Sequence, residues 1–266
     1  MAARKLVRRT ARRRSGQILV EGPQALSVAV DHLDLQQVFV TEAAAARHRE
    51  LLAQVAASST ELFVVENEVA AALSETVTPQ GIVGVAAAPT ATLADLPPTP
   101  RLVAVLVGPR DPGNLGTIIR TADAAGADAV LITDEAADPF SGKAIRASAG
   151  SVFALPVIDD ISTSAALGTL VGLGVRLLAT TGAGVVDLDT VIDDGILSDS
   201  TGWLFGTEAS GLPAAVIDEV AASGGMSLRV PVYGSAESLN IAAAAAVCLY
   251  ASARAQHMRA GEGVGG

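Results

Sequence analysis

Short apolar runs, rich in β-branched residues, alternate with longer helix-like runs through the first 88 residues of the chain. Four of the short runs predict strands, at residues 17–20, 37–40, 62–65 and 82–86. The runs between them predict helices, at residues 23–30, 42–57 and 69–73. This alternation of strand and helix favours a small α/β domain.

A second series of alternating runs follows residues 89–100, which hold four prolines and predict a stiff, extended linker. Its short runs predict strands at residues 102–107, 129–132, 154–157, 175–179, 203–205 and 227–230. Its longer runs predict helices at residues 115–125, 143–149, 163–173, 213–222 and 239–257. The strands are apolar throughout, which is typical of a parallel sheet covered by helices on both faces.

The composition is that of a globular chain with few residues suited to disulfide or metal chemistry. Half of its 266 residues are apolar but only 3% are aromatic, so the core must consist of Ala, Val, Leu and Ile. A single cysteine, Cys248, excludes an internal disulfide, and three scattered histidines disfavour a metal site, so no metal is expected. The longest apolar run, residues 241–251, is too short to span a bilayer, and no secretory segment is apparent. We therefore expect a cytoplasmic protein with no membrane partner.

The charge is distributed unevenly along the chain. Seven of the 18 basic residues precede Ser15, whereas residues 15–266 carry 11 basic and 28 acidic residues, a net charge of −17. A basic arm on an acidic body suggests contact with a polyanion, although a solvated, frayed terminus is equally compatible with the sequence. The arm also resembles a transit peptide, but the strand and turn predicted after it disfavour that interpretation.

A glycine-containing loop, residues 108–115, follows the first strand of the second series. Its two glycines stand five residues apart, as in a phosphate-binding loop, but Asn114 and Leu115 occupy the places of the required Lys and Ser/Thr. No Gly-x-Gly-x-x-Gly motif follows the start of a predicted strand either. A nucleotide- or dinucleotide-binding enzyme is therefore a disfavoured alternative.

The polar residues of this loop are still candidates for a site. Asp111 and Asn114 can cap the helix that follows, and Arg120 lies two turns further along. Capping alone would explain the first two residues, and an ion pair with Asp123 would explain the arginine. The residues by themselves leave a functional and a purely structural interpretation open.

Two further loops follow later strands, at the sheet edge where parallel α/β proteins bind ligands. Residues 205–213 place Glu208 between two glycines, although a plain strand-to-helix turn would have the same pattern. Residues 230–240 lead into the last helix, with Ser238 as a candidate N-cap and Asn240 in the first turn. The alanine-rich stretch that follows would let another backbone pack closely.

Three loop motifs, in this order and at this spacing, resemble the SpoU (TrmH-type) branch of the SPOUT RNA methyltransferases. The motifs are residues 111–122, 204–212 and 230–241. Residues 146–150, followed by 155–157, look like a further landmark of this family, and the resemblance covers residues 102–258. Residues 21–26 resemble, less closely, the opening of the ribosomal-L30-like substrate-binding domain that often precedes the catalytic domain.

The resemblance implies a fold, a cofactor and a reaction. The fold would be α/β, with a small N-terminal L30-like domain and a C-terminal parallel-sheet SPOUT domain that contains a trefoil knot, a feature that no sequence pattern reveals. The knot would bind S-adenosyl-L-methionine, mainly through backbone groups, in a homodimer. The reaction would be methylation of a ribose 2′-hydroxyl in ribosomal or transfer RNA, with ribosomal RNA favoured.

The resemblance also assigns roles to residues. Those that match the family's catalytic set are Asn114, Arg120, Glu208, Ser238 and Asn240. Those that match its cofactor contacts are Gly206, Val230 and Leu239, with the loop of Thr180, Thr181 and Gly182 closing over the cofactor. Because a guanidinium keeps its proton, Arg120 is expected to orient the nucleotide and stabilise a developing alkoxide rather than act as a base. The proton acceptor stays open between water, a substrate phosphate and Glu208.

The chain is thus predicted to comprise five segments. They are a flexible basic arm at 1–14, an L30-like RNA-binding domain at 15–88, the linker at 89–100, the methyltransferase domain at 101–260 and a disordered tail at 261–266. A non-catalytic RNA-binding or ribosome-assembly factor on the same fold is an alternative that the intact catalytic set disfavours. A methyltransferase acting on a base nitrogen or on a protein is another, disfavoured by the three motifs.

Overall fold

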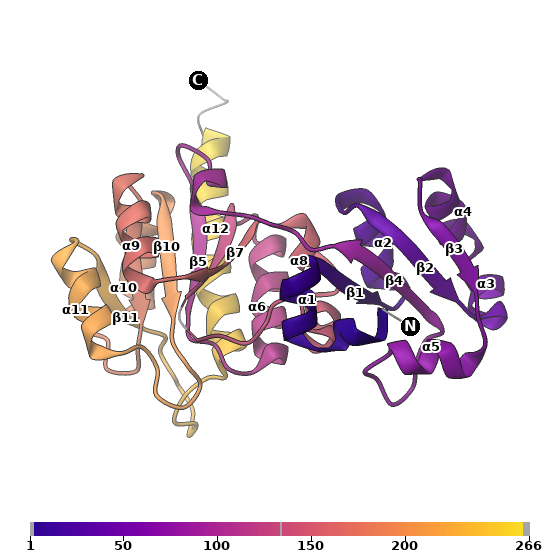
Figure 1. Cartoon of the computed structure of the whole chain (residues 1–266). Helices are drawn as coiled ribbons and strands as arrows, with labels where there is room; N and C mark the ends of the chain where they lie inside the picture. The colour runs from indigo at the N-terminus through magenta and orange to yellow at the C-terminus, as the bar shows by residue number, and fades with distance from the viewer. Residues whose placement is uncertain (1–2, 134, 263–266) are drawn as a thin grey trace. The chain divides into compact units, whose positions relative to one another are not determined.

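The computed structural model describes residues 3–133 and 135–262 (Figure 1). The chain forms two compact units. The first comprises Met1–Thr90 together with Asp138–Ala154, and the second comprises Ala91–Ala137 together with Leu155–Gly266. The short segment Asp138–Ala154, predicted as part of the methyltransferase domain, therefore packs with the N-terminal unit.

A four-stranded mixed sheet forms the centre of the first unit. Its strands, in spatial order, are β1 (Gln17–Glu21), β4 (Ile82–Ala87), β2 (Leu35–Val40) and β3 (Glu61–Val64). Strand β4 runs antiparallel to both of its neighbours, and β2 runs parallel to β3. Its helices are α2 (Pro23–His32), α3 (Glu42–Arg47), α4 (Arg49–Ala57) and α5 (Asn67–Leu73). The single helix expected over residues 42–57 is divided at His48, whose φ of −117° and ψ of 41° depart from helical geometry.

The N-terminal segment is folded in the structure, which differs from the flexible arm expected at residues 1–14. A 3₁₀-helix, η1 (Ala3–Val7), leads into helix α1 (Arg9–Ser15). Ala3 and Leu6 are buried in one apolar cluster with side chains of β1, β2, β4 and α5. These two apolar side chains give the segment a core contact of its own, although most of its other residues are exposed.

Two ion pairs tie the segment Asp138–Ala154 to the rest of the first unit. This segment contains helices α7 (Gly142–Ser148) and α8 (Ser151–Ala154), which pack against β1 and α2. Arg12 pairs with Asp138 at 2.6 Å, and Arg146 pairs with Glu21 at 2.7 Å. The signs are reversed between the two pairs, so each partner segment contributes one cation and one anion.

A seven-stranded parallel sheet forms the centre of the second unit, which confirms the predicted parallel sheet and adds a seventh strand, at residues 186–187, to the six expected. In spatial order the strands are β7 (Val157–Ile161), β6 (Ala129–Thr133), β5 (Leu102–Val107), β10 (Thr201–Phe205), β8 (Arg176–Thr180), β11 (Met226–Arg229) and β9 (Val186–Asp187). All neighbouring pairs are parallel. The strand expected at 154–157 is wrong in position, because α8 occupies residues up to Ala154 and β7 begins at Val157.

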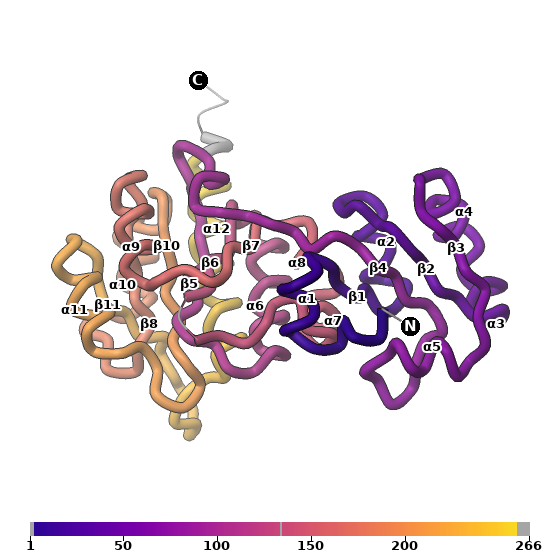
Figure 2. The backbone as a smooth tube through the Cα atoms, in the orientation of Figure 1, coloured from indigo at the N-terminus to yellow at the C-terminus, as the bar shows by residue number. Residues whose placement is uncertain are grey.

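Helices cover both faces of this sheet (Figures 1 and 2). The helical elements are η2 (Leu93–Asp95), α6 (Pro112–Ala124), α9 (Thr163–Gly172), α10 (Leu188–Asp193), η3 (Ile196–Ser198), α11 (Ala214–Ala222) and α12 (Ile241–Glu262). Side chains of α9 and α11 share one apolar cluster with β5, β8 and β10. Helix α12 packs against α6, β5 and β10, and the buried Trp203 indole donates to the Ser252 hydroxyl at 2.9 Å.

The chain order and the sheet order diverge around β10, which lies between β5 and β8 although it follows both in the sequence. The trefoil knot and the cytoplasmic location stay predictions. Of the tail expected at 261–266, residues 261 and 262 end helix α12, and residues 263–266 lie outside the described residues. No helix in the described part of the chain is long and apolar enough to cross a membrane.

Candidate functional site

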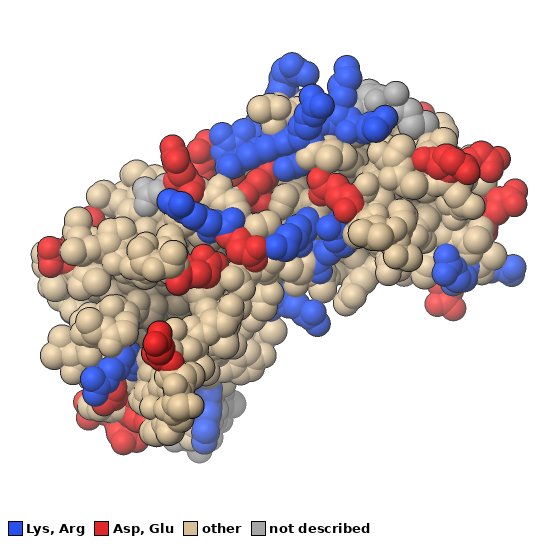
Figure 3. Space-filling model, turned by 90° about the horizontal axis from the view of Figure 1, so that it is seen from below, with Lys and Arg blue, Asp and Glu red and all other residues tan. Residues whose placement is uncertain are grey.

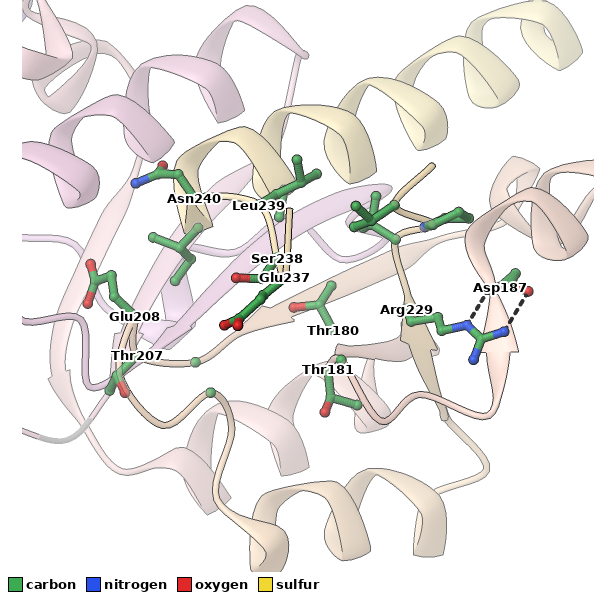
Figure 4. A pocket seen from close by; sticks show the side chains of 18 of the residues that line it. Thr180, Thr181, Asp187, Thr207, Glu208, Arg229, Glu237, Ser238, Leu239 and Asn240 are labelled. Carbon is green, nitrogen blue, oxygen red and sulfur yellow. Dashed lines mark hydrogen bonds and ion pairs between the residues drawn. The ribbon is translucent and has the colours of Figure 1, made fainter. Parts of the chain in front are cut away.

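A cavity of about 750 Å³ opens in the second unit at the carboxyl ends of β8, β10 and β11 (Figure 4). Three loops form it: the one after β8, the one after β10, and the one that joins β11 to α12. Its polar lining residues are Thr180, Thr181, Asp187, Thr207, Glu208, Arg229, Tyr233, Glu237, Ser238 and Asn240. Glycines and the apolar residues Val230, Pro231, Val232, Leu239, Ile241 and Ala244 complete the wall.

The loop after β10 is a closed turn that only glycine permits at its start. The Thr207 N–H donates to the Gly211 carbonyl at 3.0 Å, and the Gly211 N–H donates back to the Thr207 carbonyl at 2.9 Å. A Cβ atom on Gly206 would lie 2.0 Å from the Gly211 carbonyl carbon and 2.3 Å from the Leu212 nitrogen. The turn therefore folds back onto the strand end, and it holds Glu208 at the mouth of the cavity.

The loop after β8 is fixed to the neighbouring strands by its own polar groups. The Thr180 hydroxyl donates to the Leu204 carbonyl at 2.7 Å, and the Thr181 N–H donates to the Leu228 carbonyl at 2.8 Å. A Cβ atom on Gly184 would lie 2.4 Å from the Leu228 carbonyl carbon, so this loop passes in direct contact with the β11 backbone. These bonds keep Thr180, Thr181 and Gly182 at the cavity wall.

A hydrogen-bond network joins residues from all three sequence motifs. The Asn114 amide donates to Glu208 Oε1 at 2.9 Å, and the Asn240 amide donates to Asn114 Oδ1 at 3.3 Å. The Asn240 Oδ1 atom accepts from the Ala242 N–H at 2.9 Å, which fixes the side chain at the start of α12. Residues separated by 94 and 126 positions in the chain thus meet at one side of the cavity.

Capping explains Asp111, but it does not explain Asn114. The Asp111 carboxylate accepts the Asn114 backbone N–H at 2.8 Å at the start of α6, as an N-cap residue does. The Asn114 side chain is directed instead to Glu208 and Asn240. The helix cap therefore positions the amide for the polar network.

The opposite side of the cavity carries a charged cluster that sequence reasoning missed. The Arg229 guanidinium donates to both Asp187 oxygens, at 2.5 and 3.1 Å (Figure 4), and the Tyr233 hydroxyl donates to Asp189 Oδ2 at 2.5 Å. The hydrogen bond from Arg229 lowers the pKa of Asp187, and the bond to Asp189 raises the pKa of Tyr233. The partners lie 42 and 44 positions apart, and the short strand β9 that carries Asp187 has no recognisable pattern of its own.

Ten of the eleven residues singled out from the sequence come together here. Nine line the cavity: Thr180, Thr181, Gly182, Gly206, Glu208, Val230, Ser238, Leu239 and Asn240. Asn114 is bonded to two of them. Arg120 differs, because it is exposed on α6 and is not among the lining residues. Within the described residues it forms no ion pair with Asp123, so the structural explanation left open for Arg120 does not apply.

Comparison with known proteins relates both parts of the chain to RNA-modifying enzymes. Residues 101–250 match the SpoU rRNA Methylase family, and residues 1–84 match the MRM3-like substrate binding domain. The chain is 38% identical over 191 residues to the 23S rRNA (guanosine(2553)-2′-O)-methyltransferase RlmP of Bacillus subtilis, covering 71% of each protein.

Solved structures agree with these sequence matches. The SpoU methyltransferase AviRb from Streptomyces viridochromogenes, in complex with the cofactor AdoMet, superposes with a TM-score of 0.83 at 29% identity, covering 97% of each chain. An AdoMet-bound rRNA methyltransferase from Sinorhizobium meliloti superposes with a TM-score of 0.79 at 30% identity, covering 95% of this chain and 93% of the other.

Proposed function

The chain belongs to the SpoU rRNA methylase family, and we propose that it transfers a methyl group from S-adenosylmethionine to a ribose 2′-hydroxyl in ribosomal RNA. The observation that carries this proposal is the bonded set Asn114, Glu208 and Asn240, which unites the three motifs beside one cavity. A single motif would explain one loop, whereas this network requires all three loops to be in place together.

The residues that line the cavity fit S-adenosylmethionine. The side chains of Val230, Leu239 and Ile241 offer an apolar wall suited to an adenine ring, and Gly182 leaves the backbone of the loop after β8 uncovered. A volume of about 750 Å³ lies in the range that holds a ligand of this size. When bound, the cofactor supplies an electrophilic methyl group on a sulfonium centre.

The reaction requires the protein to align a ribose hydroxyl and to assist the loss of its proton. Alignment alone supplies about 7–11 kcal/mol in well-oriented systems. The Asn114 amide orients the Glu208 carboxylate, whose second oxygen can accept a hydrogen bond from the ribose hydroxyl. Ser238 and Asn240 add neutral hydrogen-bonding groups at the same side of the cavity. The proton acceptor stays open between water, a substrate phosphate and this carboxylate.

Arg120 is proposed to act on the substrate rather than on the cofactor. It is exposed on α6 and lies outside the set of cavity-lining residues, so its guanidinium is accessible to a nucleotide phosphate. A guanidinium donates several hydrogen bonds in a fixed planar geometry and keeps its positive charge. It is therefore suited to orient the nucleotide and to stabilise negative charge that develops on the ribose oxygen.

A homodimer is part of the proposal. Helix α12 presents Val247 and Tyr250 to solvent, 43% and 52% exposed, on a helix that packs beside α6. Burial of these side chains against a second copy would remove apolar surface from water. Light scattering of the purified protein is expected to give twice the mass of one chain. The double variant Val247→Asp, Tyr250→Asp is expected to give the mass of a single chain.

The function is tested by transfer of labelled methyl groups from S-adenosylmethionine to total rRNA and to total tRNA, both from cells that lack this gene. Label in the rRNA is the expected result. Label in the tRNA alone would identify transfer RNA, and not ribosomal RNA, as the substrate. If the protein binds the cofactor but labels neither pool nor intact ribosomal subunits, it would instead be a non-catalytic RNA-binding or ribosome-assembly factor.

A further inference from the structure

The folded N-terminal segment concentrates positive charge on an otherwise acidic protein. Six basic residues of η1, α1 and the turn between them are exposed: Arg4, Lys5, Arg8, Arg9, Arg13 and Arg14. We call them the basic ridge. Figure 3 shows basic side chains gathered in a band on one face of the molecule. The first acidic residue in the sequence is Glu21, and residues 15–266 carry 11 basic and 28 acidic residues. Attraction of a polyanion must therefore be local to such a surface.

A groove runs between the ridge and helix α5. Its volume is about 790 Å³, and four of the ridge cations line it: Arg4, Lys5, Arg8 and Arg14. Ala71, Ala72 and Ser74 form the facing wall, and the lining that the structure describes contains no acidic residue. Four cations around one groove repel one another, which favours the binding of an anionic chain that threads between them.

A buried arginine holds the ridge in shape. Arg12 is only 8% exposed, and its guanidinium donates to the carbonyls of Leu6 and Val7 at 2.7 and 2.8 Å. The same group donates twice to Asp138 Oδ2, at 3.2 and 2.6 Å. These bonds join the end of η1, the middle of α1 and a segment 126 residues away in the sequence.

Asp138 is itself fixed, so the anchor is rigid. Its other oxygen, Oδ1, accepts the Phe140 N–H at 2.8 Å. A seven-residue helix with four arginines is too short to be stable alone in water and needs such an external contact. An anchored ridge binds without first ordering its backbone, so it does not lose conformational entropy on binding.

We propose that the basic ridge is a preorganised binding surface for the phosphate backbone of the RNA substrate, and that the Arg12–Asp138 pair keeps it in the binding geometry. This inference rests on the proposed function, since it takes RNA as the substrate. Arginine-rich surfaces match phosphate through paired N–H donors. None of the described residues that line the groove is aromatic, so the surface contacts backbone rather than stacked bases.

The experiment measures binding of the full chain to transcribed 23S rRNA, without S-adenosylmethionine, over a series of KCl concentrations. The double variant Arg8→Gln, Arg14→Gln is expected to bind about tenfold more weakly, with a slope of log K against log [KCl] that is reduced by about 1.5. The matched control is Arg47→Gln, Arg49→Gln, which removes the same charge from exposed positions of α3 and α4 in the same unit. The control is expected to change the affinity less than twofold. Equal effects of the two double variants would overturn the proposal.

Asp138→Asn separates preorganisation from simple charge attraction. This substitution makes the protein more positive, so long-range attraction alone predicts equal or tighter RNA binding. The proposal predicts binding at least about threefold weaker, and faster trypsin cleavage within residues 4–14, because η1 and α1 lose their anchor. Circular dichroism on the same sample checks that the remaining fold is intact. Equal or tighter binding by this variant would refute the anchoring role.

Two further outcomes keep the proposal distinct from its alternatives. Polyuridylate is expected to compete with the 23S rRNA far better than polyglutamate of equal total charge, and equal competition would assign the ridge to an acidic protein instead. If the wild-type protein transfers no methyl group, but substitutions in the basic ridge still weaken RNA binding, the proposed function is overturned and the proposed surface stands. Normal methyl transfer, with RNA binding that is unchanged by substitutions in the basic ridge, would overturn the proposed surface but leave the proposed function.

Discussion

Gly206→Ala is the perturbation that tests most directly how the loop after β10 is built. The added Cβ atom would lie 2.0 Å from the Gly211 carbonyl carbon, 2.2 Å from its oxygen and 2.3 Å from the Leu212 nitrogen. All three are backbone atoms, so no side-chain rotation can relieve the contact. The turn must move by about 1 Å or more to reach ordinary van der Waals separation.

The size of the effect follows from what this shift disturbs. Overpacking of this kind costs about 1–3 kcal/mol, and each of the two hydrogen bonds between Thr207 and Gly211 contributes about 0.5–1.5 kcal/mol. The moved turn forms part of the cavity wall and carries Glu208. If the overpacking cost of about 1–3 kcal/mol alone is lost from cofactor binding, affinity for S-adenosylmethionine falls by roughly 5- to 150-fold.

Isothermal titration with S-adenosylmethionine and thermal unfolding measure the two effects separately. Gly168→Ala is the matched control, since it adds the same methyl group within α9, where a Cβ atom meets nothing within 4 Å. The control is expected to leave cofactor affinity unchanged and to stabilise the helix by up to about 1 kcal/mol. Wild-type affinity and stability in Gly206→Ala would refute the close packing on which this account of the turn depends.

Three further predictions address Arg120, the buried thiol and the ion pair between β1 and α7. Arg120→Ala is expected to leave affinity for S-adenosylmethionine within about twofold while methyl transfer falls by about 100-fold or more, and equal loss of both would contradict its role toward the substrate. Burial raises the pKa of the Cys248 thiol from 9.0 to about 12, so iodoacetamide is expected to leave it unmodified at pH 8 in the folded protein. Because the folded-state pKa is the higher one, the free energy of unfolding should fall as the pH rises from 9 towards 12, by up to about 1.4 kcal/mol per pH unit, and a flat profile would contradict the burial. Glu21→Gln leaves Arg146 without its ion-pair partner and is expected to lower the free energy of unfolding in urea by about 1–3 kcal/mol. The control Glu61→Gln, at an exposed position, should change this free energy by less than about 0.5 kcal/mol. Equal changes in the two variants would rule out a stabilising Glu21–Arg146 pair.

The elements with strong local patterns could be predicted from the sequence. Strand β5 is a run of six apolar residues, and all six are buried in the centre of the parallel sheet. Strand β7 lies at the sheet edge and carries Asp159 and Asp160, so it lacks such a run and its position does not follow from the local pattern. Helix α1 was expected as a flexible arm because its anchor, Asp138, lies 126 residues away in the sequence.

The same limit applies to the site. The three motifs contain most of the residues that line the cavity, but no local pattern could show that Asn114 bonds to Glu208 and Asn240. The Arg229–Asp187 pair was missed, since each residue looks like an ordinary surface charge until β9 is placed beside β11. Residues 21–26 and 146–150 are separate landmarks in the sequence, and the structure joins them through the Glu21–Arg146 ion pair.

The proposed methylation of the ribose 2′-oxygen can be checked by locating the transferred methyl group in the RNA. Ribosomal RNA labelled by this protein is hydrolysed in alkali, which cleaves every linkage that has a free 2′-hydroxyl next to it. If the methyl group is on the ribose 2′-oxygen, the label is recovered in an alkali-resistant dinucleotide. Recovery of the label in mononucleotides would place the methyl group on a base and contradict the claim.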